Sequence, residues 1–219
     1  MRTDEVQAQA QDAPPEGKKA QQRRESVGRL MDLARRELIA KGYEATTVEQ
    51  IAAAAGLSKG AVYFYFKSKA NLLLALIDDA ERCTVEPAVT AVRETDGSAR
   101  DKLVAFLHAQ SLVGQQYADR MMLVILMSIE FHGRGGQVEE RLKAVHDAMT
   151  TLLVDVVAAG QRAGTIAGGV PARELASVVM AVNQGCFLEW YRRRDELRGV
   201  DLVRALRTTV LHGVLAPDS

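Results

Sequence analysis

Residues 47–69 read TVEQIAAAAGLSKGAVYFYFKSK and carry the clearest structural signal in the chain. Thr47 is followed three residues later by Gln50, the spacing of a capping box, in which each of the two residues satisfies a free amide of the other at a helix start. The sequence therefore predicts a short helix that begins after Thr47 and runs to about Ala55.

The second half of this stretch predicts another short helix. Gly56 suits a tight turn, because glycine adopts left-handed backbone angles at little cost. Ser58 suits the N-cap of a helix that runs to Tyr65 or Phe66. Two short helices joined by a glycine turn are typical of a helix-turn-helix, whose second helix lies in the major groove of DNA.

The packing demands of a helix-turn-helix are met at the expected spacing. The two helices need a small residue where they cross, a glycine between them and apolar residues that seat the second helix. Ala52, Gly56 and Val62 satisfy these needs, and Ile51 and Leu57 complete a small core.

The residues that remain on the surface of this unit are the candidates for DNA contact. Gly60 allows close backbone approach, and the Tyr63 hydroxyl and the Lys69 ammonium suit phosphate oxygens. Thr47 lies at a helix N-terminus, where free amides and the helix dipole favour an anion. Alternatively, the aromatic residues form a small core, which we favour for Phe66 but not for Tyr63. The candidates from this argument are Thr47, Lys59, Gly60, Tyr63, Phe64, Tyr65 and Lys69.

Charge is unevenly distributed along the chain, although the net charge is zero. Residues 17–69 contain eleven Lys and Arg against five Asp and Glu, a net charge of +6. Residues 1–16 and residues 70–219 each carry −3. The positive charge thus coincides with the helix-turn-helix, as a phosphate-binding surface requires.

The whole chain of 219 residues, 47% apolar with five prolines, predicts an all-α fold of about nine helices. We expect a disordered tail over 1–20, a helix-turn-helix domain over 21–68, and a larger ligand-binding and dimerisation domain over 69–219, with a fourth helix from residue 68 linking the two. Gly42 is expected to end the first helix, and Pro87 to kink or end the fourth.

Several classes of protein are disfavoured by composition. No apolar run approaches the roughly 18 residues of a membrane span, and no secretory signal begins the chain, so we expect a cytoplasmic protein with no membrane partner. Cys83 and Cys186 are too few for a disulfide framework. The four histidines are scattered, so we expect no metal site and no cofactor.

The motif as a whole resembles the N-terminal domain of the TetR family of bacterial transcriptional regulators. The resemblance runs from about Arg24 to Glu81 and rests on the threonine, the I-A-x-x-A-G turn, the serine-x-glycine, and the tyrosine, phenylalanine and lysine in register. Many family members have histidine where this chain has Tyr65. The positions that match DNA contacts of the family are Thr47, Ser58, Lys59, Gly60, Tyr63 and Lys69.

The resemblance also implies a mechanism. A homodimer would place two recognition helices in successive major grooves of a palindromic double-stranded DNA operator, about 34–36 Å apart. A small-molecule effector of unknown identity, bound among the C-terminal helices, would tilt the segment 67–79 and change that separation. The last two helices would form the dimer interface. A repressor is favoured over an activator by the resemblance alone.

The effector pocket is the least defined feature of the sequence. Methionines adapt to irregular cavities, and polar residues in an apolar helix can orient a ligand, but the same residues equally suit a solid core. The candidates for ligand contact are Met121, Met122, Ile125, Glu130, Met149, Asn183, Gln184 and Phe187. The basic run 192–194 suits a solvated loop better than a second nucleic-acid patch.

Two other classes of protein were weighed. A helical enzyme is disfavoured because no phosphate loop, paired carboxylates or Ser-His or Cys-His arrangement is evident, so no catalytic residue is assigned. A helix-turn-helix module that binds protein rather than DNA is the second alternative, and Lys59, Tyr63 and Lys69 argue against it.

Overall fold

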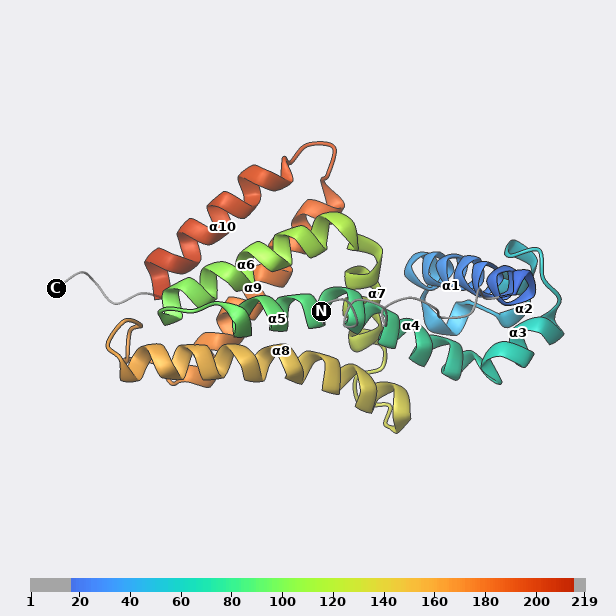
Figure 1. The fold of residues 1–219 in the computed structure, drawn as a ribbon, viewed down its shortest axis with the longest axis horizontal. Helices are drawn as coiled ribbons and strands as arrows, with labels where there is room; N and C mark the ends of the chain where they lie inside the picture. The colour runs from blue at the N-terminus through green and yellow to red at the C-terminus, as the bar shows by residue number, and fades with distance from the viewer. Residues whose placement is uncertain (1–16, 215–219) are drawn as a thin grey trace, which may run out of the picture.

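The computed structural model describes residues 17–214 and shows an elongated all-helical molecule (Figure 1). Ten helices lie within this range, and the predicted all-α fold is confirmed. The helices are α1 (Lys18–Ala45), α2 (Val48–Ala54), α3 (Lys59–Phe66), α4 (Lys69–Thr84), α5 (Glu86–Glu94), α6 (Ala99–Gln116), α7 (Ala118–Glu130), α8 (Gly136–Arg162), α9 (Ala172–Arg192) and α10 (Gly199–Val214).

The long helix α1 and the short helices α2 and α3 gather at one end of the molecule, at the right in Figure 1. Helix α4 runs from this end into a larger body formed by α5 to α10. The described C-terminal end lies at the opposite end of the long axis. Helix α4 is therefore the element that enters both parts.

The first helix differs from its predicted extent. It begins at Lys18, so residues 18–20 are helical rather than part of a tail, whereas residues 1–16 of the predicted tail lie outside the described residues. Its regular part stops at Gly42, whose φ of 80° leaves the helical region. Glycine adopts this angle because it has no Cβ, and the prediction that Gly42 ends the helix is confirmed.

The structure has one helix more than the nine expected, and the additional helix is α5, which contains Pro87. Helix α4 ends at Thr84, and α5 starts at Glu86 with the proline in its first turn, where the missing N–H costs nothing. The sequence predicted a kink or an end at this proline, and the structure shows an end followed by a new helix.

One hydrophobic core extends through both parts of the molecule. It includes Leu30 of α1, Ile51 of α2, Leu76 of α4 and Phe106 of α6, each fully buried. Helix α4 contributes Leu72, Leu73, Leu76 and Ile77 to this core, so it packs with the helices of both parts. Within the described range, no helix combines the length and the apolar character that crossing a membrane requires.

Candidate nucleic-acid interface

The first helix of the predicted motif is capped as expected. Thr47 Oγ1 accepts a hydrogen bond from Gln50 N at 3.2 Å, and Gln50 Oε1 accepts one from Thr47 N at 3.0 Å. This is a complete capping box, so the helix start is specified by two side chains only three residues apart. The Thr47 hydroxyl, expected at a phosphate, is engaged within the protein in the absence of DNA.

The turn and the seat of the second helix also match the prediction. Gly56 adopts a φ of 66°, and Leu57 N donates to Ala52 O at 2.9 Å across the turn. Ser58 Oγ caps α3 by accepting from Ala61 N at 3.2 Å. Val62 is buried against the small core beneath α3. The helix-turn-helix geometry therefore follows from local sequence.

Helix α3 presents an exposed aromatic and basic face. Phe64 is 64% exposed and Tyr63 is 39% exposed, although both are large side chains that a soluble fold normally covers. Lys59 and Gly60 are exposed at the start of the same helix. An exposed tyrosine, phenylalanine and lysine on one recognition helix offer hydroxyl, apolar and cationic contacts to a DNA groove.

The Lys59 side chain on this face pairs with a carboxylate of α2. Its ammonium forms an ion pair with Glu49 and lies 5.7 Å from the centre of the Tyr63 ring. Mutual hydrogen bonding raises the pKa of Lys59 and lowers the pKa of Glu49. Since both side chains are more than half exposed, the pair is weak, and Lys59 can exchange the carboxylate for a phosphate.

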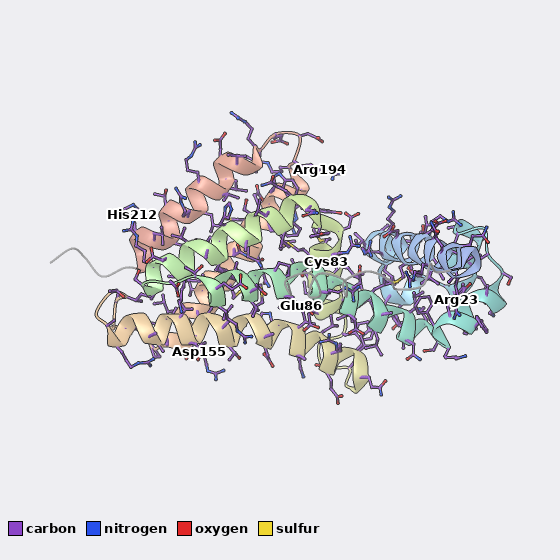
Figure 2. The ribbon with its side chains drawn as sticks, in the orientation of Figure 1. Arg23, Cys83, Glu86, Asp155, Arg194 and His212 are labelled. Atoms are coloured by element: carbon purple, nitrogen blue, oxygen red, sulfur yellow. The ribbon has the colours of Figure 1, made fainter. Side chains whose placement is uncertain are left out.

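Two further cations border the aromatic face and were not singled out from the sequence. Arg23, near the start of α1, lies 5.6 Å from the Phe64 ring and 5.5 Å from the Tyr65 ring. Lys67, just after α3, lies 5.8 Å from the Phe64 ring. Figure 2 shows Arg23 at the helix-turn-helix end of the molecule. The sequence indicates these two residues only through the excess of positive charge over residues 17–69, which does not show which of its cations lie beside the aromatic rings.

Other aromatic and cationic residues of the motif face the protein. Tyr65 and Phe66 are half-buried against the core, which agrees with the interpretation of Phe66 and leaves Tyr65 partly accessible. Lys69 Nζ donates to the carbonyl oxygens of Tyr43 at 2.7 Å and Thr46 at 2.8 Å. The Lys69 charge thus stabilises the end of α1, and its predicted phosphate contact would compete with these bonds.

A partly buried charge cluster joins the helix-turn-helix to the body. The Asp79 carboxylate of α4 accepts hydrogen bonds from Arg35 of α1 at 3.0 Å, from Arg120 of α7 at 2.7 Å, and from Arg82 of α4 at 2.9 Å. Arg35 is only 5% exposed and is therefore not part of any phosphate surface. One carboxylate thus ties together the three helices that meet between the two parts.

A second tie lies at the loop that precedes α2. The Glu130 carboxylate at the end of α7 accepts from Tyr43 N at 2.8 Å and Glu44 N at 3.2 Å. The Tyr43 ring packs edge-on against Phe131 at 4.9 Å between centroids. Glu130 was predicted as a ligand contact, but its carboxylate caps backbone amides of the loop and is not among the residues that line the cavities described below.

Comparison of the sequence and fold with known proteins identifies the family. Residues 30–76 match the model of the family described as bacterial regulatory proteins, tetR family. The crystal structure of the MbdR regulator from Azoarcus sp. CIB is 39% identical in sequence, covers 87% of this chain and 100% of that chain, and superposes with a TM-score of 0.78. The chain belongs to the TetR family. It is therefore a DNA-binding transcriptional regulator, and the prediction of a regulator rather than an enzyme is confirmed.

More distant relatives match over the same length. The repressor BepR of Brucella suis is 24% identical over 191 residues, 84% of this chain and 89% of BepR. The structure of FadR from Bacillus subtilis in complex with stearoyl-CoA superposes on this TetR-family chain with a TM-score of 0.68 at 20% identity, over 85% of this chain and 98% of that chain. The family fold thus extends through the C-terminal body.

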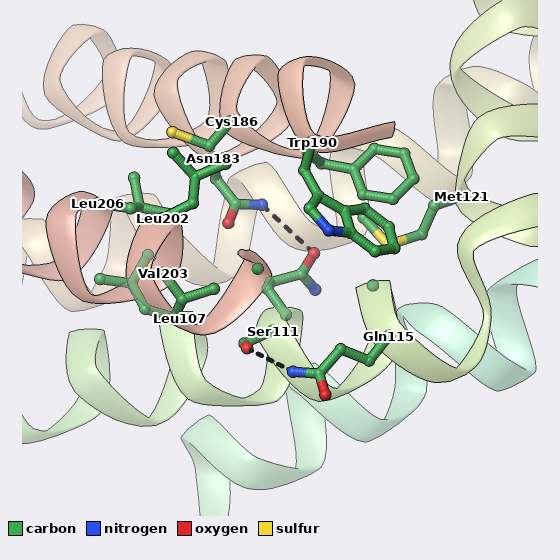
Figure 3. Close-up of a pocket in the computed structure, with 14 residues that line it drawn as sticks. Leu107, Ser111, Gln115, Met121, Asn183, Cys186, Trp190, Leu202, Val203 and Leu206 are labelled. Carbon is green, nitrogen blue, oxygen red and sulfur yellow. Dashed lines mark hydrogen bonds between the residues drawn. The ribbon is translucent and has the colours of Figure 1, made fainter. Parts of the chain in front are cut away.

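Two of the cavities in the body of this TetR-family regulator share Gln110 as a wall residue. The first lies between α6, α9 and α10, holds about 500 Å³ including its solvent-open part, and is shown in Figure 3. The second lies among α7, α8 and α9 and holds about 970 Å³ counted in the same way. Gln110 and Met121 line both.

The predicted ligand contacts divide between these cavities and the core. The first cavity is lined by Met121, Asn183 and Phe187, and the second by Met121, Ile125, Met149 and Gln184. Met122 instead packs in a small cluster with Val113 and Phe187. The sequence could not separate these outcomes, because cavity-lining and core residues share the same helical spacing.

The basic run 192–194 lies away from the recognition helix. Arg193 pairs with Glu189 and Glu196 at 2.8 Å each, and Arg194 packs 5.7 Å from the Tyr191 ring. Figure 2 places Arg194 at the connection between α9 and α10, in the body rather than at the helix-turn-helix end. This arrangement agrees with the interpretation of the run as a solvated loop.

Proposed function

We propose that this regulator is a ligand-responsive repressor. It binds a palindromic operator as a homodimer, and a small-molecule effector that enters the C-terminal body releases it from DNA. The DNA contacts are made by the predicted residues at the start of α2, at the start of α3 and along α3, and at the start of α4, with Arg23 and Lys67 added from the structure. A regulator of this kind acts on the chromosome, so we place it in the cytoplasm.

The observation that carries the proposal is the continuity between the recognition helix and the cavities. Helix α3 is followed directly by α4, whose Asp79 binds Arg120 of α7. The turn before α7, at Tyr117, joins it to α6, which lines both cavities. A molecule that displaces α6 or α7 therefore acts on α4, and through α4 on the spacing of two recognition helices.

The relatives support an effector and a repressive role. BepR is named as a repressor, and FadR holds stearoyl-CoA in a structure with the same fold. An effector releases DNA only to the extent that it prefers the protein state with the wrong helix separation. The proposed repressor thus needs two conformations that differ at α4.

The operator is found by selecting bound fragments from genomic DNA and reading the shared palindrome. With a labelled operator, Tyr63→Ala should weaken binding about 10- to 100-fold, the loss expected for a specific contact of about 1–3 kcal/mol. Lys67→Ala should lower the slope of log affinity against log salt by about two in a dimer, one phosphate per protomer. Fluorescence anisotropy measures both.

Arg194→Ala is the matched control, because Arg194 is exposed but lies in the body, and it should leave operator affinity unchanged. Selection of no fragment by a folded sample would favour the alternative of a protein-interaction module. Recovery of an operator whose promoter is more active when the regulator is bound would show an activator instead of a repressor.

A further inference from the structure

The first cavity has walls without a charged side chain. Its fourteen lining residues include no Asp, Glu, Lys, Arg or His, and most are apolar, such as Leu107, Phe187 and Leu206. A charged group that enters such a space loses its hydration and gains no ionic partner there. The walls therefore select against ions.

The polar feature of this cavity is a pair of buried amides. Gln110 and Asn183 are each 5% exposed, and Asn183 Nδ2 donates to Gln110 Oε1 at 3.4 Å, a long hydrogen bond drawn in Figure 3. Gln110 Nε2 has the sulfur of Met149 as its acceptor, at 3.6 Å. Among the described residues, no hydrogen bond to Asn183 Oδ1 is formed.

This pair leaves one donor and one acceptor without a strong partner. Each amide has an oxygen and an NH₂ group, and their mutual bond uses one of each. Whichever amide donates, one NH₂ and one carbonyl oxygen remain. Asn183 Oδ1 is not among the buried polar atoms that lack a partner, so it is reachable from the cavity, and a ligand that replaces the weak sulfur contact and bonds this oxygen gains from both interactions.

We propose that the part of the effector which enters this cavity is uncharged and largely apolar, and that it carries one group that both accepts and donates a hydrogen bond, held by Gln110 and Asn183. Primary amides, alcohols and undissociated acids have such a group. The assignment rests on the proposed function, since it names the chemical class of that effector.

The surroundings set the shape of the apolar part. Gly114 lines the cavity with its backbone, and Gly199 lies where an added Cβ would be 3.2 Å from Trp190 Nε1. Ser111 and Gln115 form a hydrogen bond at 3.3 Å and are more accessible than the amide pair, so they mark the mouth. The enclosed part of the cavity is small, about 60 Å³, so an alkyl chain whose polar group lies at the pair would extend along these walls toward the open mouth.

The test uses two probes of equal length, octanamide and octanoate, which differ in charge at neutral pH. Trp190 is the single tryptophan of the chain and lines the cavity, so its emission reports occupancy without a label. We expect a saturable change with octanamide and an affinity at least tenfold weaker for octanoate at pH 8. Equal affinities, or no saturable change with octanamide, would overturn the inference.

Matched variants locate the binding. Asn183→Leu keeps the side-chain volume and removes the amide, and should weaken octanamide binding about tenfold. Gln184→Leu makes the same change one residue later, at the second cavity, and should not. Loss with Gln184→Leu and retention with Asn183→Leu would place the probe in the second cavity and refute the assignment.

A third variant protects the test against misfolding. Val203→Phe adds bulk to the cavity wall that α10 contributes and leaves both amides in the sequence, so it should abolish octanamide binding while the circular dichroism melting curve stays cooperative. Binding that survives this change counts against the site. Operator affinity is measured on the same native protein. If the folded protein binds no operator, the proposed function is wrong. If it binds the operator but binds octanamide and octanoate equally, only the present inference is wrong.

Discussion

Lys69 and Tyr63 were predicted from the same motif to contact phosphate, yet the structure gives them different environments. Tyr63 is exposed on the recognition helix, whereas the Lys69 ammonium lies 4.0 Å from the Tyr43 ring and binds two carbonyl oxygens at the end of α1. Lys69 thus holds the loop from which α2 starts.

Lys69→Met should therefore lower the free energy of unfolding by about 1–3 kcal/mol, because it removes charge-assisted hydrogen bonds from carbonyl groups that stay partly buried. Tyr63→Phe removes an exposed hydroxyl and should change stability by less than about 0.5 kcal/mol. Urea unfolding followed by circular dichroism measures both variants. Equal stability of the two proteins would show that the Lys69 contacts contribute nothing.

What sequence can reveal about single residues depends on distance along the chain. The capping and turn roles of Thr47, Gln50, Gly56 and Ser58 were predicted correctly because their partners lie within five residues. The roles of Lys69 and Glu130 involve partners 23 to 87 residues away, so spacing carries no trace of them. The candidate DNA face was accordingly easier to predict than the effector cavity.

The connection between α7 and α8 is held by one carboxylate. Glu139 accepts hydrogen bonds from Gly133 N at 2.9 Å and from Gly135 N, and pairs with Lys143 at 3.0 Å. The two backbone amides, followed by Lys143, lower the pKa of Glu139 from 4.5 to about 2. The charged form is thus the one that the folded loop stabilises.

A pH dependence follows, with a defined sign. The folded pKa of Glu139 is depressed, so its contribution to stability is fully present above about 4.5 and is lost as the pH falls toward 2. The difference in unfolding free energy between the native protein and Glu139→Gln should be largest at pH 7 and shrink at pH 3. A difference that stays constant would show that the charge plays no part.

Helix boundaries were predictable where a cap or a proline marks them. Pro87 signalled the end of α4, but the short α5 after it has no side-chain N-cap and was not foreseen. The Ser98–Asp101 capping box at the start of α6 is visible in the sequence as S-x-x-D.

The two parts of the molecule are coupled through Asp79, which no local pattern identifies. Its carboxylate is 14% exposed and meets arginines from three helices, and Arg35 Nε is buried without a hydrogen bond. The site is therefore sensitive: removing the carboxylate leaves the largely buried Arg35 with Asp32 as its remaining ionic partner.

Asp79→Leu should lower the unfolding free energy by about 2–4 kcal/mol. The double variant Arg35→Met/Asp79→Leu should recover part of the loss, because Arg35, the most deeply buried of the three arginines, is then no longer a charge without its partner. Asp78→Leu, next along α4, is the control: Asp78 is 55% exposed, and its loss should cost less than about 1 kcal/mol. Chemical unfolding of the native protein and these three variants tests this prediction, and equal losses of stability for Asp78→Leu and Asp79→Leu would refute it.

The shared wall between the two cavities has a thermodynamic consequence. Gln110 and Met121 belong to both, so a compound that moves either side chain from one side alters the free energy of occupying the other. Linkage requires such an influence to be equal in both directions. If one compound binds in each cavity, the first changes the affinity for the second by some factor, and the second changes the affinity for the first by the same factor. Dose–response curves recorded with mixtures of the two compounds measure this factor.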